Sequence, residues 1–372
     1  MSDQYSRRNK FTELRSIHKS YIDLYNALYQ VKTEKEEDLN TIYKNIQTEL
    51  IDSMKFPPQS IIRDILKIIP YNNRYVNAYL TLAKRISDDY HVEDVSNVEP
   101  ISNYMFYKEY GIKLDKSRDF NEINKYYLDI HTKNTIYKVI MNNDIEKFIF
   151  LTGAEGFNEH LFLESDLYPY TPYRYTLLDI CCYHGAIDCF KFLRTKFNSK
   201  ISDDSLRFSF LGGNPEIMSE CLKYKKPYEE CMKYAIISHN IGFVTFLMNE
   251  YNLKIDLKWC RLYNNLESFL VYFDQTKNIN ECFLNSIKFN IPPLCEYILS
   301  CGANIHTKNR HGNTALHKAV NINSKEMVEF LLSHGANINE KNKNGDTVLH
   351  FAAFNNSKEM VEFLLSPWCK YQ

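Results

Sequence analysis

The feature that most constrains this chain is a segment of identical residues that occurs twice. Residues 324–333 and 357–366 both read SKEMVEFLLS, and the two copies begin 33 residues apart. A related block precedes each copy at the same distance, at 312–317 and at 345–350. Regular periods of this length mark proteins built from stacked units, because a single unit cannot bury its own apolar face. We therefore expect an array of repeats rather than one globular core.

The preceding blocks resemble the signature of a known family. They read TALH from Thr314 to His317 and TVLH from Thr347 to His350. Ankyrin repeats have a similar Thr-Pro-Leu-His block and the same period. Proline is missing from both blocks, but proline at the first helical position is favoured rather than required. The resemblance implies an all-α, ankyrin-type α-solenoid, with short β-turn fingers only in the regular repeats.

The residues of the two regular repeats have physical roles that agree with this resemblance. Thr314 and Thr347 stand where a hydroxyl can accept hydrogen bonds from the open N–H groups of a helix start. The apolar residues of the repeated segment follow at helical spacing, and Gly302 and Gly335 suit the left-handed residue that closes a helix. The residues that we assign to the repeat signature are Thr314, Leu316, His317, Gly335, Thr347, Leu349 and His350.

Weaker copies of the repeat extend upstream. Counting back from the valine of VEFL, we place these units at Phe148, Phe190, Ser219, Val244, Leu270 and Cys295. Spacings of about 25 residues in the middle of the series leave room for two helices of about ten residues and a turn, but not for a finger. We therefore predict helix pairs without fingers from about residue 205 to 290.

The best of these weaker copies begins at Thr176. Asp179 stands there at the position where the regular repeats have histidine. The segment before it, 153–175, is a long insertion that we expect to form an elaborated finger or loop. Its tyrosines are Tyr168, Tyr170, Tyr173 and Tyr175. Aromatic side chains in such a loop can anchor a partner, although packing onto their own repeat is the simpler role.

The N-terminal region shows helical periodicity without a detectable repeat. Apolar residues from Leu14 to Val31 alternate spacings of three and four, as in a coiled-coil seam. We expect helical hairpins in 1–134 with an acidic linker near 88–99, degenerate ankyrin-like helix pairs in 135–290, and regular ankyrin repeats in 291–372. The arrangement is similar to that of protist ankyrin proteins with an upstream helical domain of unknown function.

Charge and cysteine content narrow the class of protein. The chain has 45 Lys and Arg against 46 Asp and Glu, so no overall basic field attracts nucleic acid or anionic membrane. The 10 cysteines are scattered without a CxxC motif, which favours a reduced, intracellular protein in the cytoplasm or the nucleus. We find no signal-peptide pattern and no apolar run long enough to span a membrane.

The residues with potential chemistry form no recognisable catalytic motif. G-x-S-x-G, Walker A, G-x-G-x-x-G and H-E-x-x-H are all missing. The histidines in or beside the regular repeats lack the compact spacing of zinc ligands; they are His306, His311, His317, His334 and His350. Cys181, Cys182, His184 and Cys189 lie close together in sequence, and core packing is their simpler interpretation. We expect no enzyme, no metal and no cofactor.

The surface of the regular repeats is the main functional candidate. In the ankyrin family, the finger turns and the exposed end of the first helix contact partners. Transferred to this chain, the candidate protein-binding residues are Arg310, His311, Asn313, Asn321, Ile322, Lys343, Asn344, Asp346, Phe354 and Asn355. We therefore expect a non-catalytic module or adaptor for protein–protein interaction that displays this surface rigidly.

A second hypothesis concerns the N-terminal seam. Leu14, Tyr21 and Leu28 would line a helical interface between two copies of the chain. The protein would then be a self-associating structural scaffold, a homo-oligomer that displays two ankyrin arms.

Overall fold

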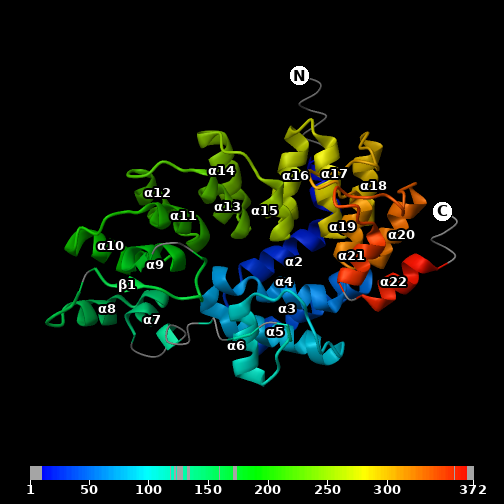
Figure 1. Cartoon of the computed structure of the whole chain (residues 1–372). Coiled ribbons are helices and arrows are strands. Elements are labelled where there is room, and N and C mark those ends of the chain that lie inside the picture. Colours follow the sequence, from blue (N-terminus) through cyan, green and yellow to red (C-terminus); the bar gives the residue numbers. More distant parts are fainter. Residues whose placement is uncertain are drawn as a thin grey trace. The chain divides into compact units, whose positions relative to one another are not determined.

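The structure is a computed structural model, and it is all-α, as expected (Figure 1). It describes residues 11–117, 119–120, 123, 129–131, 135–158, 160–170, 174–355 and 357–366. The only strands among these residues are β1 (Phe162–Leu163) and β2 (Tyr175–Thr176).

The chain divides into two compact units. The C-terminal unit comprises residues 1–25, 41–61 and 256–372, and the central unit comprises 26–40 and 62–255. Each unit therefore contains helix pairs together with part of the N-terminal region. This division differs from the three consecutive parts expected from the sequence, because the N-terminal helices bury their apolar residues within the units that contain the repeats.

The central unit contains four helix pairs. They are α7 (Ile136–Met141) with α8 (Ile145–Thr152), α9 (Leu177–His184) with α10 (Ile187–Lys196), α11 (Asp203–Gly212) with α12 (Pro215–Leu222), and α13 (Glu229–Ile237) with α14 (Ile241–Tyr251). The first helices of these pairs pack side by side in chain order, α7 on α9, α9 on α11 and α11 on α13. This is the stacking that the repeat predicts.

The C-terminal unit contains four further pairs. They are α15 (Leu257–Leu262) with α16 (Leu266–Gln275), α17 (Ile279–Ser286) with α18 (Pro292–Ser300), α19 (Ala315–Asn321) with α20 (Lys325–Ser333), and α21 (Val348–Phe354) with α22 (Lys358–Leu365). A short 3-10 turn, η6 (Ile287–Phe289), continues α17. Again each first helix packs on the next, α15 on α17, α17 on α19 and α19 on α21.

The turn inside each pair follows one local rule. In the seven pairs from α7–α8 to α19–α20, a residue with positive φ lies directly before the N-cap of the second helix, at Asn143, Gly185, Gly213, His239, Asn264, Asn290 and Asn323. Glycine and asparagine adopt this left-handed conformation at the least cost. The following residue often caps the helix, as Asn214 does by accepting from the amides of Glu216 and Ile217. The rule fixes where each second helix begins, with or without a finger.

This rule corrects two of the predicted repeat positions. In the regular repeats, the valine of VEFL is the fourth residue after the helix cap. The same count from the cap Asn214 gives Met218 rather than Ser219, whose side chain is exposed. It likewise gives Phe269 rather than Leu270 in α16. The predicted positions were shifted by one residue because the degenerate copies offer two apolar alignments.

The predicted helix pairs without fingers between 205 and 290 are confirmed. Helices α11 to α18 follow one another through short connections, and no described residue in this range is in a strand. The insertion before α9 contains an elaborated finger, in which β1 and β2 pair antiparallel with Phe162 opposite Thr176. Pro172 and Tyr173 of this insertion lie outside the described residues.

The N-terminal region consists of short helices. They are α2 (Lys19–Tyr29), α3 (Glu36–Asn45), the π-helix η1 (Ile46–Ser53), α4 (Pro58–Leu66), α5 (Val76–Asp89) and α6 (Pro100–Tyr110), with 3-10 turns η2 (Ile69–Tyr71), η3 (Asn73–Tyr75) and η5 (Asp129–His131). The predicted acidic linker is not a free connection. Val92, Val95 and Val98 are buried, and the amide of Val95 donates to the carbonyl of Leu114 at 2.9 Å.

The apolar residues that the scaffold hypothesis places at an interface between copies are buried inside the folded chain. Leu14, Tyr21 and Leu28 are all buried. In the C-terminal unit, the ring of Tyr21 meets Phe289 edge to face, with 6.2 Å between centroids. These side chains are therefore not free to line an interface between copies unless they first leave their present packing.

Candidate functional site

The candidate site begins with two finger loops, which precede α19 and α21. Gly312 lies at the tip of the first loop with a φ of 79°. A Cβ atom at this position would meet the amide nitrogen of Lys343 at 2.6 Å, so only glycine allows the second loop to approach this closely. The amide of Lys343 donates to the carbonyl of His311 at 3.0 Å. The two tips therefore form one continuous rim.

Side chains also tie the finger loops together. The side-chain amide of Asn342 donates to the side-chain oxygen of Asn313 at 3.0 Å and to a carboxylate oxygen of Asp346 at 3.2 Å. Asn313 and Asp346 are half-buried, whereas Arg310 and Lys343 are exposed. Asn313 and Asp346 thus shape the fingers, and the exposed tips are left to meet a partner.

The remaining candidate residues lie at the far end of the first helices. Asn321 and Ile322 end α19, and Phe354 and Asn355 end α21. Because α19 is a helix of 7 residues, its two ends are about 10 Å apart. The Phe354 side chain is 88% exposed, an unusual position for an aromatic ring. The predicted residues therefore form two groups, the finger tips and the helix ends, on one repeat surface.

The signature residues have the predicted structural roles. Thr314 and Thr347 are helix caps, each in a capping box with the histidine three residues later. Gly335 closes its helix with a φ of 88°. The ring of His317 is fully buried, and its Nε2 lies 3.1 Å from the carbonyl oxygen of Asp346 in the next finger. Leu316 is buried below the cap, whereas Leu349 and His350 are more exposed.

Lys318 is a charged residue of the regular repeats for which the sequence predicted no role. Its ammonium group donates to the carbonyl of Leu284 at 2.8 Å. Burial lowers the pKa of Lys318 to about 8, because desolvation penalises the charged form. Its role is to join α19 to the preceding pair.

Metal binding and nucleophilic chemistry require particular arrangements of the histidines and cysteines that the sequence singled out. No group of three or more His, Cys, Asp or Glu in the described part of the chain is arranged to hold a metal ion. Cys181, Cys182 and Cys189 are buried, and desolvation raises the pKa of each thiol, to about 12 for Cys189. A thiol with a raised pKa is a poor nucleophile at neutral pH. Their packing role agrees with the simpler interpretation of the sequence.

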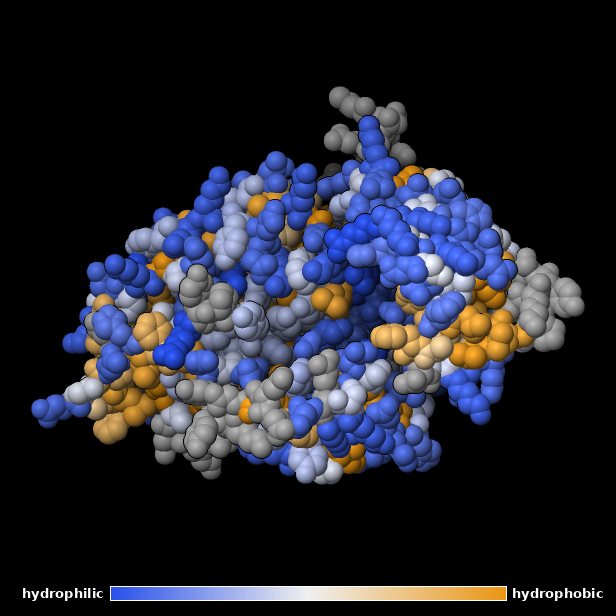
Figure 2. Space-filling view, viewed as in Figure 1, coloured by the Kyte–Doolittle hydropathy of each residue, from blue (hydrophilic) through white to orange (hydrophobic). Residues whose placement is uncertain are grey.

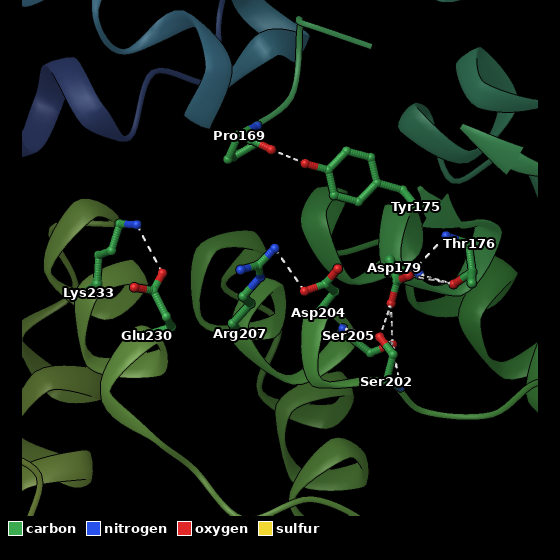
Figure 3. Close-up of polar contacts among 10 residues, drawn as sticks. All are labelled: Pro169, Tyr175, Thr176, Asp179, Ser202, Asp204, Ser205, Arg207, Glu230 and Lys233. Carbon is green, nitrogen blue, oxygen red and sulfur yellow. Dashed lines mark hydrogen bonds and ion pairs between the residues drawn. The ribbon is translucent and has the colours of Figure 1, made fainter. Parts of the chain in front are cut away.

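A polar network links two neighbouring helix pairs of the central unit, α9–α10 and α11–α12 (Figure 3). Asp179 is buried, and one carboxylate oxygen accepts from the hydroxyls of Ser202 and Ser205 at 2.6 and 2.5 Å. The other oxygen accepts from the amide and the hydroxyl of Thr176 at 2.9 and 2.7 Å. Asp179 therefore caps its own helix and holds the start of the next pair.

Arg207 on α11 is a buried cation that the sequence analysis missed. Its guanidinium lies 2.8 Å from the carboxylate of Asp204 (Figure 3). The guanidinium also stands over the ring of Tyr234, 5.5 Å from the centroid. Burial opposes its charge, but the neighbouring tyrosines and Asp204 hold its pKa above the ordinary value. The sequence offered no clear signal for this burial, because α11 contains Asp203, Asp204 and two serines beside its apolar residues.

In the central unit, the first helices are covered by the chain's own N-terminal region. The hydroxyl of Tyr183 donates to the carbonyl of Pro70 at 2.9 Å and accepts from the amide of Asn73 at 3.1 Å. The ring of Tyr234 lies 6.3 Å from that of Tyr71. These contacts leave no wide first-helix face for a partner in the fingerless pairs.

The tyrosines of the insertion have mostly packing roles. Tyr168 and Tyr175 are buried, and the Tyr168 hydroxyl lies between the rings of His131 and His184. Tyr170 is 89% exposed, so it is the accessible one of the three described tyrosines. Tyr173 lies outside the described residues.

These helix pairs, their caps and their stacked fingers define a helical-repeat protein of the solenoid class. Residues 284–371 match the family described as ankyrin repeats (3 copies), and the chain carries ankyrin repeats in this range. Upstream, residues 197–272 match a domain of unknown function (DUF3447). The comparison with curated proteins gives no match. Ankyrin repeats are in general modules for protein–protein interaction.

The helices of the described segments do not include a membrane span. None of them is both long enough and apolar enough to cross a bilayer.

Proposed function

We propose that the two regular ankyrin repeats bind another protein through their finger tips and the exposed ends of their first helices. In this function the chain is a non-catalytic adaptor. The binding surface contains Arg310, His311, Lys343 and Asn344 at the tips, with Ile322 and Phe354 at the helix ends. A rigid surface of this kind loses little conformational freedom on binding, which favours affinity.

The observation that carries the proposal is the exposure of α21, the first helix of the second regular repeat. More than half of the residues are buried in each of the first helices α9, α11, α13 and α19. In α21, by contrast, only Val348 and Ala352 are buried. Figure 2 shows apolar residues over α21 and α22 beside the hydrophilic surface of the finger loops. An apolar area with a polar rim has the composition of a binding surface.

Three side chains are expected to contribute most of the binding energy. Phe354 and Ile322 offer apolar area, and Arg310 offers a planar donor group for a carboxylate or a carbonyl. Arginine and large aromatic residues are enriched among the residues that dominate interfaces. All three side chains lie on the described surface of the regular repeats, and none of them makes a side-chain hydrogen bond that caps a helix, although Ile322 is the C-cap residue of α19.

The test is an affinity purification of chemically cross-linked partners with the full chain, quantified by mass spectrometry. The variant is Arg310→Ala/Ile322→Ala/Phe354→Ala. The control is Lys358→Ala/Glu359→Ala/Glu362→Ala, which changes three exposed side chains of α22. We expect partners to fall at least tenfold with the first variant and to remain with the control.

Two outcomes would contradict this proposal. Equal recovery of the same partners with both triple variants would exclude the finger and helix-end surface. Recovery of the chain alone, with a sedimentation coefficient that rises with concentration, would favour the self-associating scaffold. Circular dichroism of both variants establishes that the fold is unchanged.

The cellular location is part of the same proposal. The described cysteines are all unpaired, and eight of the nine are buried. Proteins rich in unpaired cysteines are typical of reducing compartments. This supports an adaptor that works inside the cell.

A further inference from the structure

The exposed tips of the two finger loops carry more positive than negative charge. We call this set the finger strip; its exposed basic residues are Lys308, Arg310, Lys341 and Lys343, with His311 between them. Within the described segments, no carboxylate lies in ion-pair distance of Arg310, Lys341 or Lys343. These three cations are therefore available to a ligand.

The two carboxylates of the finger loops are already engaged. Glu340 lies 2.5 Å from the ammonium group of Lys308, and this hydrogen bond lowers the pKa of Glu340. Asp346 accepts from the side-chain amide of Asn342, on the inner side of its loop. Neither carboxylate neutralises Arg310, Lys341 or Lys343.

The strip has a fixed geometry. The bond from the Lys343 amide to the His311 carbonyl joins the two tips, and the amide of Asn313 donates to Asn309 at 3.0 Å within the first loop. His317 holds the second loop through the Asp346 carbonyl. Because the loops are held by main-chain and buried bonds, the cations keep their spacing when the side chains meet a ligand.

The other carboxylates of these repeats lie on the second helices, as Glu326 and Glu329 on α20 and as Glu359 and Glu362 on α22. Each second helix thus has two glutamates against one lysine, whereas the finger loops have more cations than carboxylates. An uneven distribution of this kind steers a ligand of opposite charge to one surface.

We propose that the finger strip binds an acidic, extended segment of the partner protein. This inference rests on the proposed function, because it names the chemistry of the partner for the same surface. Aspartate and glutamate side chains pair with Arg310, Lys341 and Lys343. An apolar side chain further along the partner reaches Phe354 and Ile322 at the helix ends.

A nucleic acid fits the surface less well. Single-stranded nucleic acid binds to grooves in which basic residues alternate with several stacking aromatic rings. Here one exposed ring, Phe354, lies a helix length away from the cations, and the whole chain has a formal charge of -1. The finger strip is short and flanked by carboxylates, which favours a short acidic peptide.

The test is selection from a library of random 16-residue peptides on the immobilised full chain. The charge-reversed variant is Arg310→Glu/Lys343→Glu, and its matched control is Lys325→Glu/Lys358→Glu on the second helices. We expect the wild type and the control to enrich peptides rich in Asp and Glu. The charge-reversed variant is expected to enrich peptides rich in Lys and Arg instead.

Fluorescence anisotropy of one enriched peptide then measures the effect. We expect the Arg310→Glu/Lys343→Glu variant to bind the peptide at least tenfold more weakly than the wild type at 0.05 M salt. The difference is expected to be smaller at 0.5 M salt, because salt screens electrostatic attraction. A peptide with Gln and Asn in place of Glu and Asp is expected to lose affinity similarly.

The possible outcomes separate this inference from the proposed function. Enriched peptides without acidic residues, whose binding the Arg310→Ala/Ile322→Ala/Phe354→Ala variant abolishes, would overturn the acidic partner and keep the binding surface. Acidic peptides bound equally by all variants would place recognition elsewhere. Tighter binding of a single-stranded RNA oligonucleotide, lost on Arg310→Glu/Lys343→Glu, would assign the strip to nucleic acid instead.

Discussion

The carboxylate of Asp179 accepts a 2.5 Å hydrogen bond from the hydroxyl of Ser205, which belongs to the next helix pair (Figure 3). His317 occupies the corresponding position of a regular repeat, third after the helix cap. There the imidazole bonds its own cap threonine and the carbonyl of Asp346 in the next finger. Where no finger follows, the carboxylate of Asp179 makes the equivalent link by accepting from the hydroxyls of Ser202 and Ser205. One position thus links neighbouring repeats through two different chemistries.

This relationship predicts the effect of removing the carboxylate. Asp179→Ala is expected to lower the free energy of unfolding by about 2–4 kcal/mol, because it removes a cap and leaves buried hydroxyls without an acceptor. Urea denaturation followed by circular dichroism measures this change. The control is Asp52→Ala at an exposed site, where we expect a change within about 0.5 kcal/mol. A loss below about 1 kcal/mol for Asp179→Ala would show that the link contributes little.

The matched histidines of the regular repeats allow a second prediction. His317 is fully buried and bonds the Asp346 carbonyl, whereas His350 is exposed in a block of the same pattern. His317→Ala is expected to cost about 2–3 kcal/mol and His350→Ala less than about 1 kcal/mol. Thermal unfolding of the two variants beside the wild type makes the comparison. Equal losses would mean that the cap bond alone, which both histidines make, determines the effect.

The sequence predicted the fold best where residue types are restricted by backbone geometry. Gly312 and the helix cap Thr314 allow few alternatives, so the regular repeats were recognised with their turns. The degenerate pairs keep only the approximate spacing of the repeat. This spacing alone did not distinguish Met218 from Ser219 or Phe269 from Leu270. The left-handed Asn264 and Asn290 before each second helix were the stronger signal, because this conformation is costly for most other residues.

The site was predicted only in part, for a different physical reason. Family resemblance located Arg310, Lys343 and Phe354, which are exposed on the regular repeats. It gave no indication that the N-terminal region covers the central first helices, because long-range packing leaves no local pattern. The contact of Asn73 with Tyr183 joins residues that are 110 positions apart.

A buried cluster of two histidines and a tyrosine predicts a dependence of stability on pH. The hydroxyl of Tyr168 lies 3.0 Å from Nε2 of His131 and 2.8 Å from Nε2 of His184. Desolvation lowers the pKa of His131 to about 3 and that of His184 well below its ordinary value. Lys138 adds to both shifts, and Arg74 adds to that of His184, by repelling the charged imidazole. The folded chain therefore holds both rings neutral.

The sign of the pH effect follows from these lowered values. Below about pH 6.5 the unfolded chain binds protons that the folded chain does not, so stability falls as the pH falls from 6.5 towards 3. Each histidine contributes up to about 1.4 kcal/mol per pH unit in this window. Urea denaturation of the wild type and of His131→Gln/His184→Gln at pH 7.5, 6.5, 5.5 and 5.0 compares the slopes. The variant is expected to have the shallower slope, and the exposed His306→Gln is the control; parallel slopes for all three chains would disprove the assignment.

Substitutions in the N-terminal seam distinguish the adaptor hypothesis from the scaffold hypothesis. Leu28 is 1% exposed, and its carbonyl accepts from the hydroxyl of Tyr79 at 2.9 Å within the central unit. Leu28→Ala is expected to lower the free energy of unfolding by about 2–5 kcal/mol through a cavity, without a change in sedimentation coefficient. Ile17 belongs to the same sequence pattern but is 61% exposed, so Ile17→Ala is the matched control and should change neither quantity.

The scaffold hypothesis requires the opposite result from these two variants. If the seam forms an interface between copies, the sedimentation coefficient of the wild type rises with concentration. Leu28→Ala and Ile17→Ala both then lower this coefficient, because both side chains belong to the pattern that lines the seam. Analytical ultracentrifugation over a hundredfold range of concentration distinguishes the two results. Because Leu28 is already packed inside its own unit, a loss of stability in the monomer is the result that the structure favours.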